Sequence, residues 1–217
     1  MKNNSYSFIF DLDGTLIDSL PDMYHAITLT INDYKLNPIS QEKLQTFVGK
    51  GMLNLAEQVV IYCGGTTLLT KDFYNSYRNY YAEQPYKYSR FMPYVIETLD
   101  YFYNKNIIMS ICTNKRQSVT ERLVEQSGLK KYFKAIIGSQ ETLPLKPSPD
   151  MINTLIEELN ISVDEYFMVG DTTIDMEAAR LASIKSIGVL GGYTEESIKG
   201  IGNFTISNLK GLKKIFK

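Results

Sequence analysis

The sequence predicts an α/β protein with a doubly wound parallel sheet and a helical insertion after the first strand. Short runs that are apolar throughout alternate with segments whose apolar residues recur every three or four positions. These patterns are typical of strands covered on both faces and of amphipathic helices. One connection, between the first two expected strands, is far longer than the roughly 12 residues that a crossover helix needs. A chain of 217 residues is long enough for one large domain or for a domain with an insert.

The expected strands form the core of this prediction. They are residues 7–10, 107–112, 135–138, 166–169 and 186–190, with 204–206 as an edge strand. Helices between them are indicated by the spacing of Val95, Leu99 and Phe102, of Val119 and Leu123, of Met151, Leu155 and Leu159, and of Met176, Ala179 and Leu181. Strands that alternate with helices predict a parallel sheet with right-handed crossovers.

The long connection has a helical pattern of its own. Its apolar residues are Leu20, Met23, Ile27 and Ile31; Leu44, Phe47 and Val48; Leu53, Ala56, Val59 and Val60; and Phe73, Tyr77 and Tyr80. We therefore expect a helical cap domain at residues 15–88, inserted into a core domain of residues 1–14 and 89–217. Pro85 and the following Y-K-Y-S-R-F would form the return linker.

Composition limits the partners of the protein. Lys and Arg number 23 and Asp and Glu 24, so no basic field attracts nucleic acid or an anionic membrane, and we expect a small-molecule partner. The chain shows neither the apolar stretch of a signal peptide nor a run of about 18 apolar residues, which indicates a cytoplasmic protein. Cys63 and Cys112 have no CxxC or histidine neighbours, which favours reduced thiols over a disulfide or a zinc site. The sequence does not indicate an oligomeric state.

Two features of the insertion allow a functional alternative. In Y-N-S-Y-R-N-Y-Y-A-E-Q-P-Y-K-Y, tyrosines interleave with Arg78 and Lys87, as in platforms that stack single-stranded nucleic acid. The cations are few, however, and tyrosines three or four residues apart also suit a packed helix, which we favour. His25 is the only histidine, and we interpret it as structural. A mechanism based on a histidine base is therefore not expected.

Polar residues follow four of the expected strands. They are Asp11 and Asp13 after the first; Thr113, Asn114 and Lys115 after the second; Lys146 beyond the third; and Asp171 and Asp175 after the fourth. Each has an ordinary structural interpretation: an Asx-type turn before Gly14 or at Asp171, a helix N-cap at Thr113, or a solvated loop lysine at Lys146. Because ligands of open α/β sheets bind beyond the carboxyl ends of the strands, their coincidence favours one site.

The motifs D-L-D-G-T-L-I-D-S, C-T-N, K-P-S-P-D and G-D-T-T-I-D-M occur in this order. With them the sequence resembles the haloacid dehalogenase superfamily, and within it the phosphoglycolate-phosphatase-like branch. The resemblance covers the core from end to end and implies a Rossmann-like core with an inserted helical cap. It also implies a Mg²⁺-dependent phosphatase that acts on a small phosphate ester, foremost 2-phosphoglycolate, through an aspartyl-phosphate.

The resemblance implies a role for each acid. Asp11 would be the nucleophile and a metal ligand, and Asp13 would offer the metal its backbone carbonyl and act as general acid and base. Asp171 would be a direct ligand and Asp175 a supporting acid. Clustered carboxylates suit Mg²⁺, which is a hard cation with oxygen ligands.

Four further residues would contact the substrate. Thr113, Asn114 and Lys146 are expected to bind the phosphate, with backbone N–H groups at the start of the helix after Thr113 assisting. In the cap, F-V-G-K-G-M places Lys50 between two glycines and before a helix, as in the V-G-x-G turn common in phosphoglycolate phosphatases. A closing cap would bring Lys50 close to a substrate carboxylate, and the alternative is a solvated lysine on a mobile loop.

Differences from the motifs of related enzymes narrow the type of reaction that we expect. Dehalogenases lack the second acid, so Asp13 argues for phosphate chemistry. Sugar phosphomutases carry E-D-S in the fourth motif and an arginine after the K-G turn of the cap, whereas this chain has G-D-T and G-K-G-M-L-N. Hydrolysis is therefore favoured, with pyrophosphate, nucleotides and sugar phosphates as alternative substrates. A non-enzymatic binding protein is not expected, because such a protein would have lost Asp11, Asp13 or a metal-binding acid.

Overall fold

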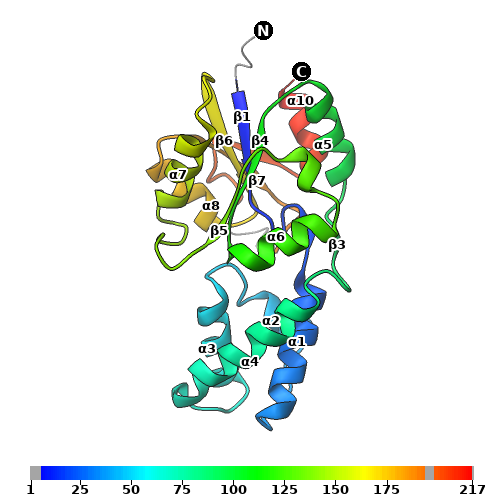
Figure 1. The fold of residues 1–217 in the computed structure, drawn as a ribbon, viewed down its shortest axis with the longest axis vertical. Coiled ribbons are helices and arrows are strands. Elements are labelled where there is room, and N and C mark those ends of the chain that lie inside the picture. The colour runs from blue at the N-terminus through cyan, green and yellow to red at the C-terminus, as the bar shows by residue number, and fades with distance from the viewer. Residues whose placement is uncertain (1–5, 194–197, 217) are drawn as a thin grey trace. The chain divides into compact units, whose positions relative to one another are not determined.

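A computed structural model describes residues 6–193 and 198–216 of the chain. Its contacts divide the chain into two compact units, one made of Met1–Ile17 and Phe91–Lys217 and the other of Asp18–Arg90 (Figure 1). The domain boundaries expected from the sequence lie between residues 14 and 15 and between residues 88 and 89. The chain passes between the units through a two-stranded sheet of β2 (Ile17–Asp18) and β3 (Arg90–Phe91).

The first unit contains a six-stranded sheet in the order β5-β4-β1-β6-β7-β8, and every neighbouring pair is parallel. The strands are β1 (Tyr6–Phe10), β4 (Met109–Arg116), β5 (Ile136–Ser139), β6 (Glu165–Gly170), β7 (Lys185–Val189) and β8 (Phe204–Ile206). The predicted doubly wound parallel sheet is confirmed, with residues 204–206 at its edge. The order reverses at β1, because the chain first adds β4 and β5 on one side and then β6 to β8 on the other.

Helices cover both faces of this sheet (Figure 1). They are α5 (Val95–Asn104), α6 (Gln117–Gln126), α7 (Asp150–Leu159), α8 (Thr173–Leu181) and α10 (Leu212–Ile215), with short 3₁₀ turns η2 (Lys130–Tyr132) and η3 (Leu209–Gly211). Ile9 of β1 packs with apolar residues of α7 and α8. Phe8 points to the other face, where its ring lies 4.9 Å from those of Phe102 and Phe216. Successive strand residues face opposite layers, which explains why β1 is apolar throughout.

The second unit is helical. It contains α1 (Leu20–Asp33), α2 (Gln41–Gln45), α3 (Met52–Tyr62), the 3₁₀ turn η1 (Thr67–Leu69) and α4 (Thr70–Glu83), and α4 packs against α1 and α3. Tyr77 and Tyr81 are buried, as the interpretation of the tyrosine-rich stretch as a packed helix requires. Leu53 was expected on the packed face of its helix but is 54% exposed. The buried stripe of α3 instead runs through Leu55, Ala56, Val59 and Val60.

One buried acid organises the start of this unit. Asp22, in the first turn of α1, accepts hydrogen bonds from the backbone N–H groups of Tyr88 (2.9 Å) and Ser89 (2.8 Å). These bonds tie the returning segment to the helix and satisfy a carboxylate that would be costly to bury alone. His25 is exposed and meets the ring of Tyr88 edge to face at 5.2 Å.

Within residues 6–193 and 198–216, none of the helices combines the length and the apolar character that a membrane span requires.

Candidate active site

The carboxyl ends of β1 and β6 bring acids from distant parts of the chain together. Phe10 and Val169 are register partners on these neighbouring strands, and the Asp11 N–H donates to the Val169 carbonyl at 2.8 Å. Asp11 follows β1 directly, and Asp171 follows β6. Carboxylate oxygens of Asp11, Asp171 and Asp175 all lie within 4.8 Å of one another, and all three residues are buried. The structure thus places together three acids that the sequence analysis assigned to one site.

Asp171 is held by hydrogen bonds to both of its carboxylate oxygens. The Thr15 hydroxyl donates to Oδ1 at 3.0 Å, and the backbone N–H of Tyr193 donates to Oδ2 at 2.7 Å. Burial raises the pKa of Asp171 well above its ordinary value, and the charges of Asp11 and Asp175 raise it further. The sequence analysis did not identify Thr15 or Tyr193 as partners, although Thr15 stands in the quoted D-L-D-G-T motif.

Glycines allow the backbone to approach these acids closely. A Cβ on Gly14, whose φ is 84°, would lie 2.5 Å from Oδ2 of Asp171. A Cβ on Gly192 would lie 2.5 Å from Cγ of Asp171, and one on Gly170 would lie 2.6 Å from Cβ of Asp175. Such contacts are far inside van der Waals distance, so each position requires a residue without a side chain.

Lys146 connects two of the acids. Its ammonium donates to Oδ1 of Asp11 at 2.8 Å, to Oδ1 of Asp175 at 2.6 Å and to the Cys112 carbonyl at 2.7 Å. These three bonds match the three N–H donors of a lysine. Burial alone would lower the pKa of Lys146, but the charges of Asp11 and Asp175 outweigh it and hold that pKa above its ordinary value. Lys146 is therefore not the solvated loop lysine of the alternative interpretation.

The acid that the resemblance assigns as nucleophile also has a shifted pKa. Burial raises the pKa of Asp11 to about 7, since it outweighs the opposing attraction of Lys146, and the charge of Asp175 adds to the rise. Asp175 is the third residue of α8, and its Oδ2 accepts from the N–H and the hydroxyl of Thr172 at 3.1 and 2.7 Å. This capping box fixes Asp175 at the start of the helix.

The segment after Cys112 differs from the prediction. Strand β4 continues to Arg116 and α6 begins only at Gln117, so Thr113 is not the N-cap of a helix. The register between β4 and β5 shifts between Cys112 and Arg116. Residues 113–115 therefore lie within the strand but are not part of a regular ladder with β5. The apolar pattern could not reveal this extension, because residues 113–116 are all polar.

Thr113 and Asn114 lie within this irregular segment. Thr113 is 2% exposed, and its hydroxyl oxygen accepts the N–H of Lys115 at 3.2 Å. The Asn114 amide bonds the backbone of Lys146 on both sides: its Nδ2 donates to the carbonyl at 2.9 Å, and its Oδ1 accepts from the N–H at 2.8 Å. The side chain of Asn114 thereby holds the loop that presents Lys146.

Asp13 lies beside a second buried lysine. The Lys115 ammonium contacts Oδ1 of Asp13 at 2.9 Å and Oδ2 at 3.1 Å. The carboxylate of Asp13 does not belong to the cluster of Asp11, Asp171 and Asp175. Lys115 follows the second expected strand, but no role was predicted for it, because the sequence alone does not distinguish a buried lysine there from a solvated one.

Lys50 lies in the helical unit and is exposed. It stands between Gly49, with φ of 117°, and Gly51, with φ of 86°, and Gly51 is the N-cap of α3. Both glycines adopt the left-handed backbone conformations that other residues avoid. The expected turn and helix start are therefore present, while the role of Lys50 in substrate recognition stays a prediction.

The donor set fits a divalent cation. Two ammonium groups lie among the four acids: Lys115 pairs with Asp13, and Lys146 pairs with Asp11 and Asp175, near Asp171. When all are ionised, two negative charges are in excess over these ammonium groups, and the repulsion among the acids adds to the effect of burial in raising the pKa values of Asp11 and Asp171. An all-oxygen cluster with this charge suits Mg²⁺.

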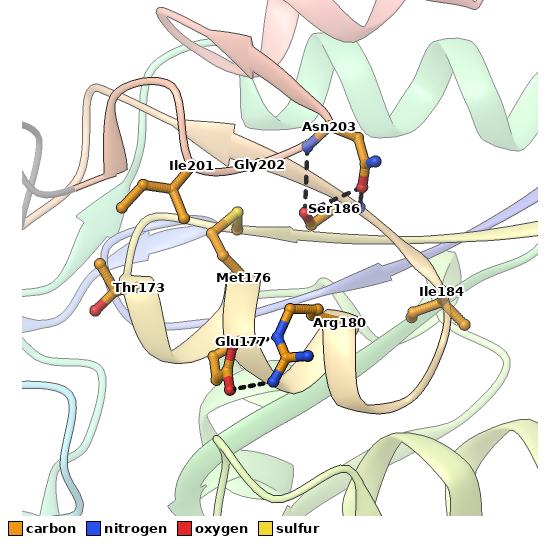
Figure 2. Close-up of a pocket in the computed structure, with 9 residues that line it drawn as sticks. All are labelled: Thr173, Met176, Glu177, Arg180, Ile184, Ser186, Ile201, Gly202 and Asn203. Carbon is orange, nitrogen blue, oxygen red and sulfur yellow. Dashed lines mark hydrogen bonds and ion pairs between the residues drawn. The ribbon is translucent and has the colours of Figure 1, made fainter.

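A separate cavity of about 450 Å³ lies between α8 and the segment of residues 201–203 before β8 (Figure 2). Thr173, Met176, Glu177 and Arg180 line it, and their spacing places them on one face of the helix. Asp175 points to the opposite face, toward Lys146. The cavity is therefore not part of the acid cluster.

Comparison with known proteins agrees with this geometry. The family model of the haloacid dehalogenase-like hydrolases matches residues 8–189. The chain is 36% identical over 191 residues to a phosphoglycolate phosphatase of Agrobacterium fabrum, covering 86% of this chain and 81% of the relative. It is 31% identical over 189 residues to a phosphoglycolate phosphatase of Vibrio parahaemolyticus, covering 85% and 83%. A crystal structure described as a predicted phosphoglycolate phosphatase from Haemophilus somnus superposes with a TM-score of 0.90 at 26% identity, covering 100% of both chains.

The chain belongs to the haloacid dehalogenase-like hydrolase family. Within this family it is a phosphatase of the branch that resembles phosphoglycolate phosphatase.

Proposed function

We propose that the protein hydrolyses a small phosphate monoester with Mg²⁺, through a phosphorylated Asp11. One observation carries this proposal: the Asp11 carboxylate is buried at the end of β1, with its Oδ1 fixed by Lys146 at 2.8 Å beside Asp171 and Asp175. A carboxylate held in this way is positioned for attack on phosphorus and does not require a histidine or a serine nucleophile.

The metal would be held by the side chains of Asp11 and Asp171 and by the backbone carbonyl of Asp13, with Asp175 as the supporting acid. When bound, Mg²⁺ would neutralise part of the negative charge that otherwise repels a nucleophile from a phosphate monoester. The fixed orientation of Asp171, between Thr15 and the Tyr193 N–H, supports its assignment as a ligand.

The residues of the chain account for both chemical steps. In the first, a carboxylate oxygen of Asp11 forms a bond to phosphorus while the bond from phosphorus to the ester oxygen breaks, and Asp13 gives its proton to the departing alcohol. In the second, water attacks the phosphoryl group and gives a proton to Asp13. The bond from Asp11 to phosphorus then breaks, which releases phosphate and restores both acids.

Lys146 and Thr113 would bind the phosphoryl oxygens, and Asn114 would support them. Lys146 would supply a positive charge, and Thr113 would donate its hydroxyl proton, since a hydroxyl whose oxygen accepts the Lys115 N–H can still act as a donor. Asn114 would act mainly by holding the Lys146 backbone, as its two hydrogen bonds with that backbone indicate.

The substrate we favour is 2-phosphoglycolate. Relatives with 31% and 36% identity that carry the name phosphoglycolate phosphatase support this choice. We propose that the exposed Lys50 recognises the substrate carboxylate, because α3 adds its free N–H groups and the positive end of its dipole at the same turn.

Phosphate release tests the proposal directly. The purified protein is assayed with 4-nitrophenyl phosphate, 2-phosphoglycolate, pyrophosphate and a hexose phosphate, with Mg²⁺ and with excess EDTA. We expect release that requires Mg²⁺ and a kcat/KM that is highest for 2-phosphoglycolate. A highest kcat/KM for another ester would replace the substrate and keep the reaction. No Mg²⁺-dependent release from any ester would refute the reaction itself.

A further inference from the structure

We propose that Lys115 is a positioning residue for Asp13, which holds the carboxylate in place for proton transfer to the leaving group and from water. The inference rests on the proposed function and extends it to a residue outside the four motifs. It is carried by the contact of one buried ammonium with both oxygens of the Asp13 carboxylate.

The geometry restrains Asp13 more than a single hydrogen bond would. The distances from Nζ of Lys115 to the two oxygens differ by only 0.2 Å, at 2.9 and 3.1 Å, so the ammonium faces the open side of the carboxylate group. The two contacts hold the carboxylate group at a defined distance from the Lys115 ammonium and so restrain the position of the Asp13 side chain.

Burial makes this ion pair unlike a surface pair. The side chain of Lys115 is 2% exposed and that of Asp13 is 15% exposed. A lysine normally keeps its ammonium in water, and burying it is costly unless a charged partner compensates. The buried Lys115 ammonium lies beside Asp13, which the proposed mechanism uses for both proton transfers. This position favours a functional reason for burying the lysine.

The backbone of Lys115 is fixed on both sides. Its N–H donates to the Thr113 hydroxyl at 3.2 Å, and its carbonyl accepts from the Thr120 hydroxyl at 3.2 Å. A Cβ on Gly138 of the neighbouring strand would lie only 2.6 Å from the Lys115 carbonyl oxygen, so β5 approaches this backbone as closely as glycine permits. The register shift of β4 between Cys112 and Arg116 contains Lys115, and such irregularities redirect side chains.

The position of Lys115 also separates its role from that of Lys146. Lys146 contacts Asp11 and Asp175, whereas Lys115 contacts Asp13. One lysine therefore serves the acid that would attack phosphorus, and the other serves the acid that would carry the proton. Loss of Lys115 should then affect the proton transfer more than the attack.

The experiment compares esters that differ in their need for a proton. Lys115→Met removes the ammonium and retains a side chain of similar length, and Lys115→Gln is a second variant that retains one donor group. Single-turnover rates and kcat/KM are measured with 2,4-dinitrophenyl phosphate, whose alcohol leaves without a proton, and with 2-phosphoglycolate, whose alcohol needs one. Lys134→Met, at an exposed lysine, is the matched control. Thermal unfolding of every variant verifies that it is folded.

We expect Lys115→Met to slow the single-turnover cleavage of 2-phosphoglycolate by at least about tenfold and that of 2,4-dinitrophenyl phosphate by less than about threefold, because a general acid contributes roughly 10²- to 10⁴-fold. Lys115→Gln should fall between Lys115→Met and the wild type. In an Asp13→Asn background, Lys115→Met should have little further effect, because the group that it positions is already absent.

The possible outcomes distinguish this inference from the proposed function. Equal losses in the single-turnover cleavage rates of both esters, multiplicative losses in the double variant, or a gain of activity would overturn the role of Lys115 while the phosphatase assignment stands. A wild-type protein that cleaves neither ester would overturn the proposed function and the inference together. A coupling between Lys115→Met and Asp13→Asn in the free energy of unfolding provides a readout without turnover, and its absence would also refute the positioning contact.

Discussion

Lys146 and Asp175 form an ion pair of 2.6 Å in which the two side chains are only 2% and 1% exposed. The same ammonium also contacts Asp11 at 2.8 Å. Removing one partner of such a buried pair leaves an uncompensated charge in the interior, which is far more costly than removing a partner from a solvated pair. The chain contains a solvated pair for comparison, because Arg180 and Glu177 are 67% and 44% exposed.

We therefore expect Lys146→Met to lower the free energy of unfolding by about 3–5 kcal/mol. Arg180→Ala, the control at the solvated pair, should cost less than about 1 kcal/mol. Urea unfolding of the two variants and the wild type in the same buffer measures both. Similar, small losses in the two variants would show that Lys146 is not needed to compensate the acids in the folded protein.

The nucleophile is tested by Asp11→Asn. The amide has nearly the shape of the carboxylate but is a poor nucleophile. The activation free energy of turnover should therefore rise by several kcal/mol, while the protein stays folded. Asp164→Asn, at an exposed acid of the same unit, is the control. If Asp11→Asn keeps more than about a tenth of the wild-type rate, its activation free energy has risen by less than roughly 1.4 kcal/mol. That result would exclude Asp11 as the nucleophile.

The proton donor is tested by Asp13→Asn. If Asp13 protonates the departing alcohol, this variant should slow phosphoryl transfer from esters with poor leaving groups much more than from an activated aryl ester. Breakdown of the phospho-enzyme should also slow, because the same residue receives the proton of water. Rapid-quench measurement of both steps provides the comparison, and an equal slowing of the first step for all esters would rule out the assignment.

The metal is tested without turnover. Mg²⁺ that binds only the folded protein at a concentration of about 100 times its dissociation constant should stabilise it by about 2.7 kcal/mol. Asp171→Asn removes a proposed ligand and should abolish most of this stabilisation. Thermal unfolding with MgCl₂ is compared with unfolding at matched ionic strength in NaCl. An unchanged Mg²⁺ effect in the variant would place the metal elsewhere.

Substrate recognition is tested by Lys50→Ala. If the ammonium binds a substrate carboxylate, kcat/KM for 2-phosphoglycolate should fall at least tenfold, about 1.4 kcal/mol, while that for 4-nitrophenyl phosphate should hardly change. Lys71→Ala, at another exposed lysine of the helical unit, is the matched control. Equal losses on both esters would indicate a conformational or folding effect, and no loss on either would make Lys50 a surface residue.

Local patterns predicted the strands of the six-stranded sheet and most of the helices. The apolar strands and the helices with apolar residues three and four apart predicted the parallel sheet, because burial on one or both faces imposes these periods on the sequence. The end of β4 was missed, since Thr113, Asn114, Lys115 and Arg116 carry no apolar signal. Their conformation depends on pairing with β5 and on the close approach at Gly138, which are properties of the sheet.

The sequence by itself determined which residues could form the site. Asp11, Asp13, Lys146, Asp171 and Asp175 are identified by motif order, and the reversal of strand order explains why such strand ends meet. Only the tertiary structure decided the pairing among them: Lys146 with Asp11 and Asp175, Lys115 with Asp13, and Thr15 with Asp171. The physical reason is that a hydrogen bond depends on a few tenths of an ångström and on direction. Spacing along the chain does not specify these for residues 29 to 156 positions apart.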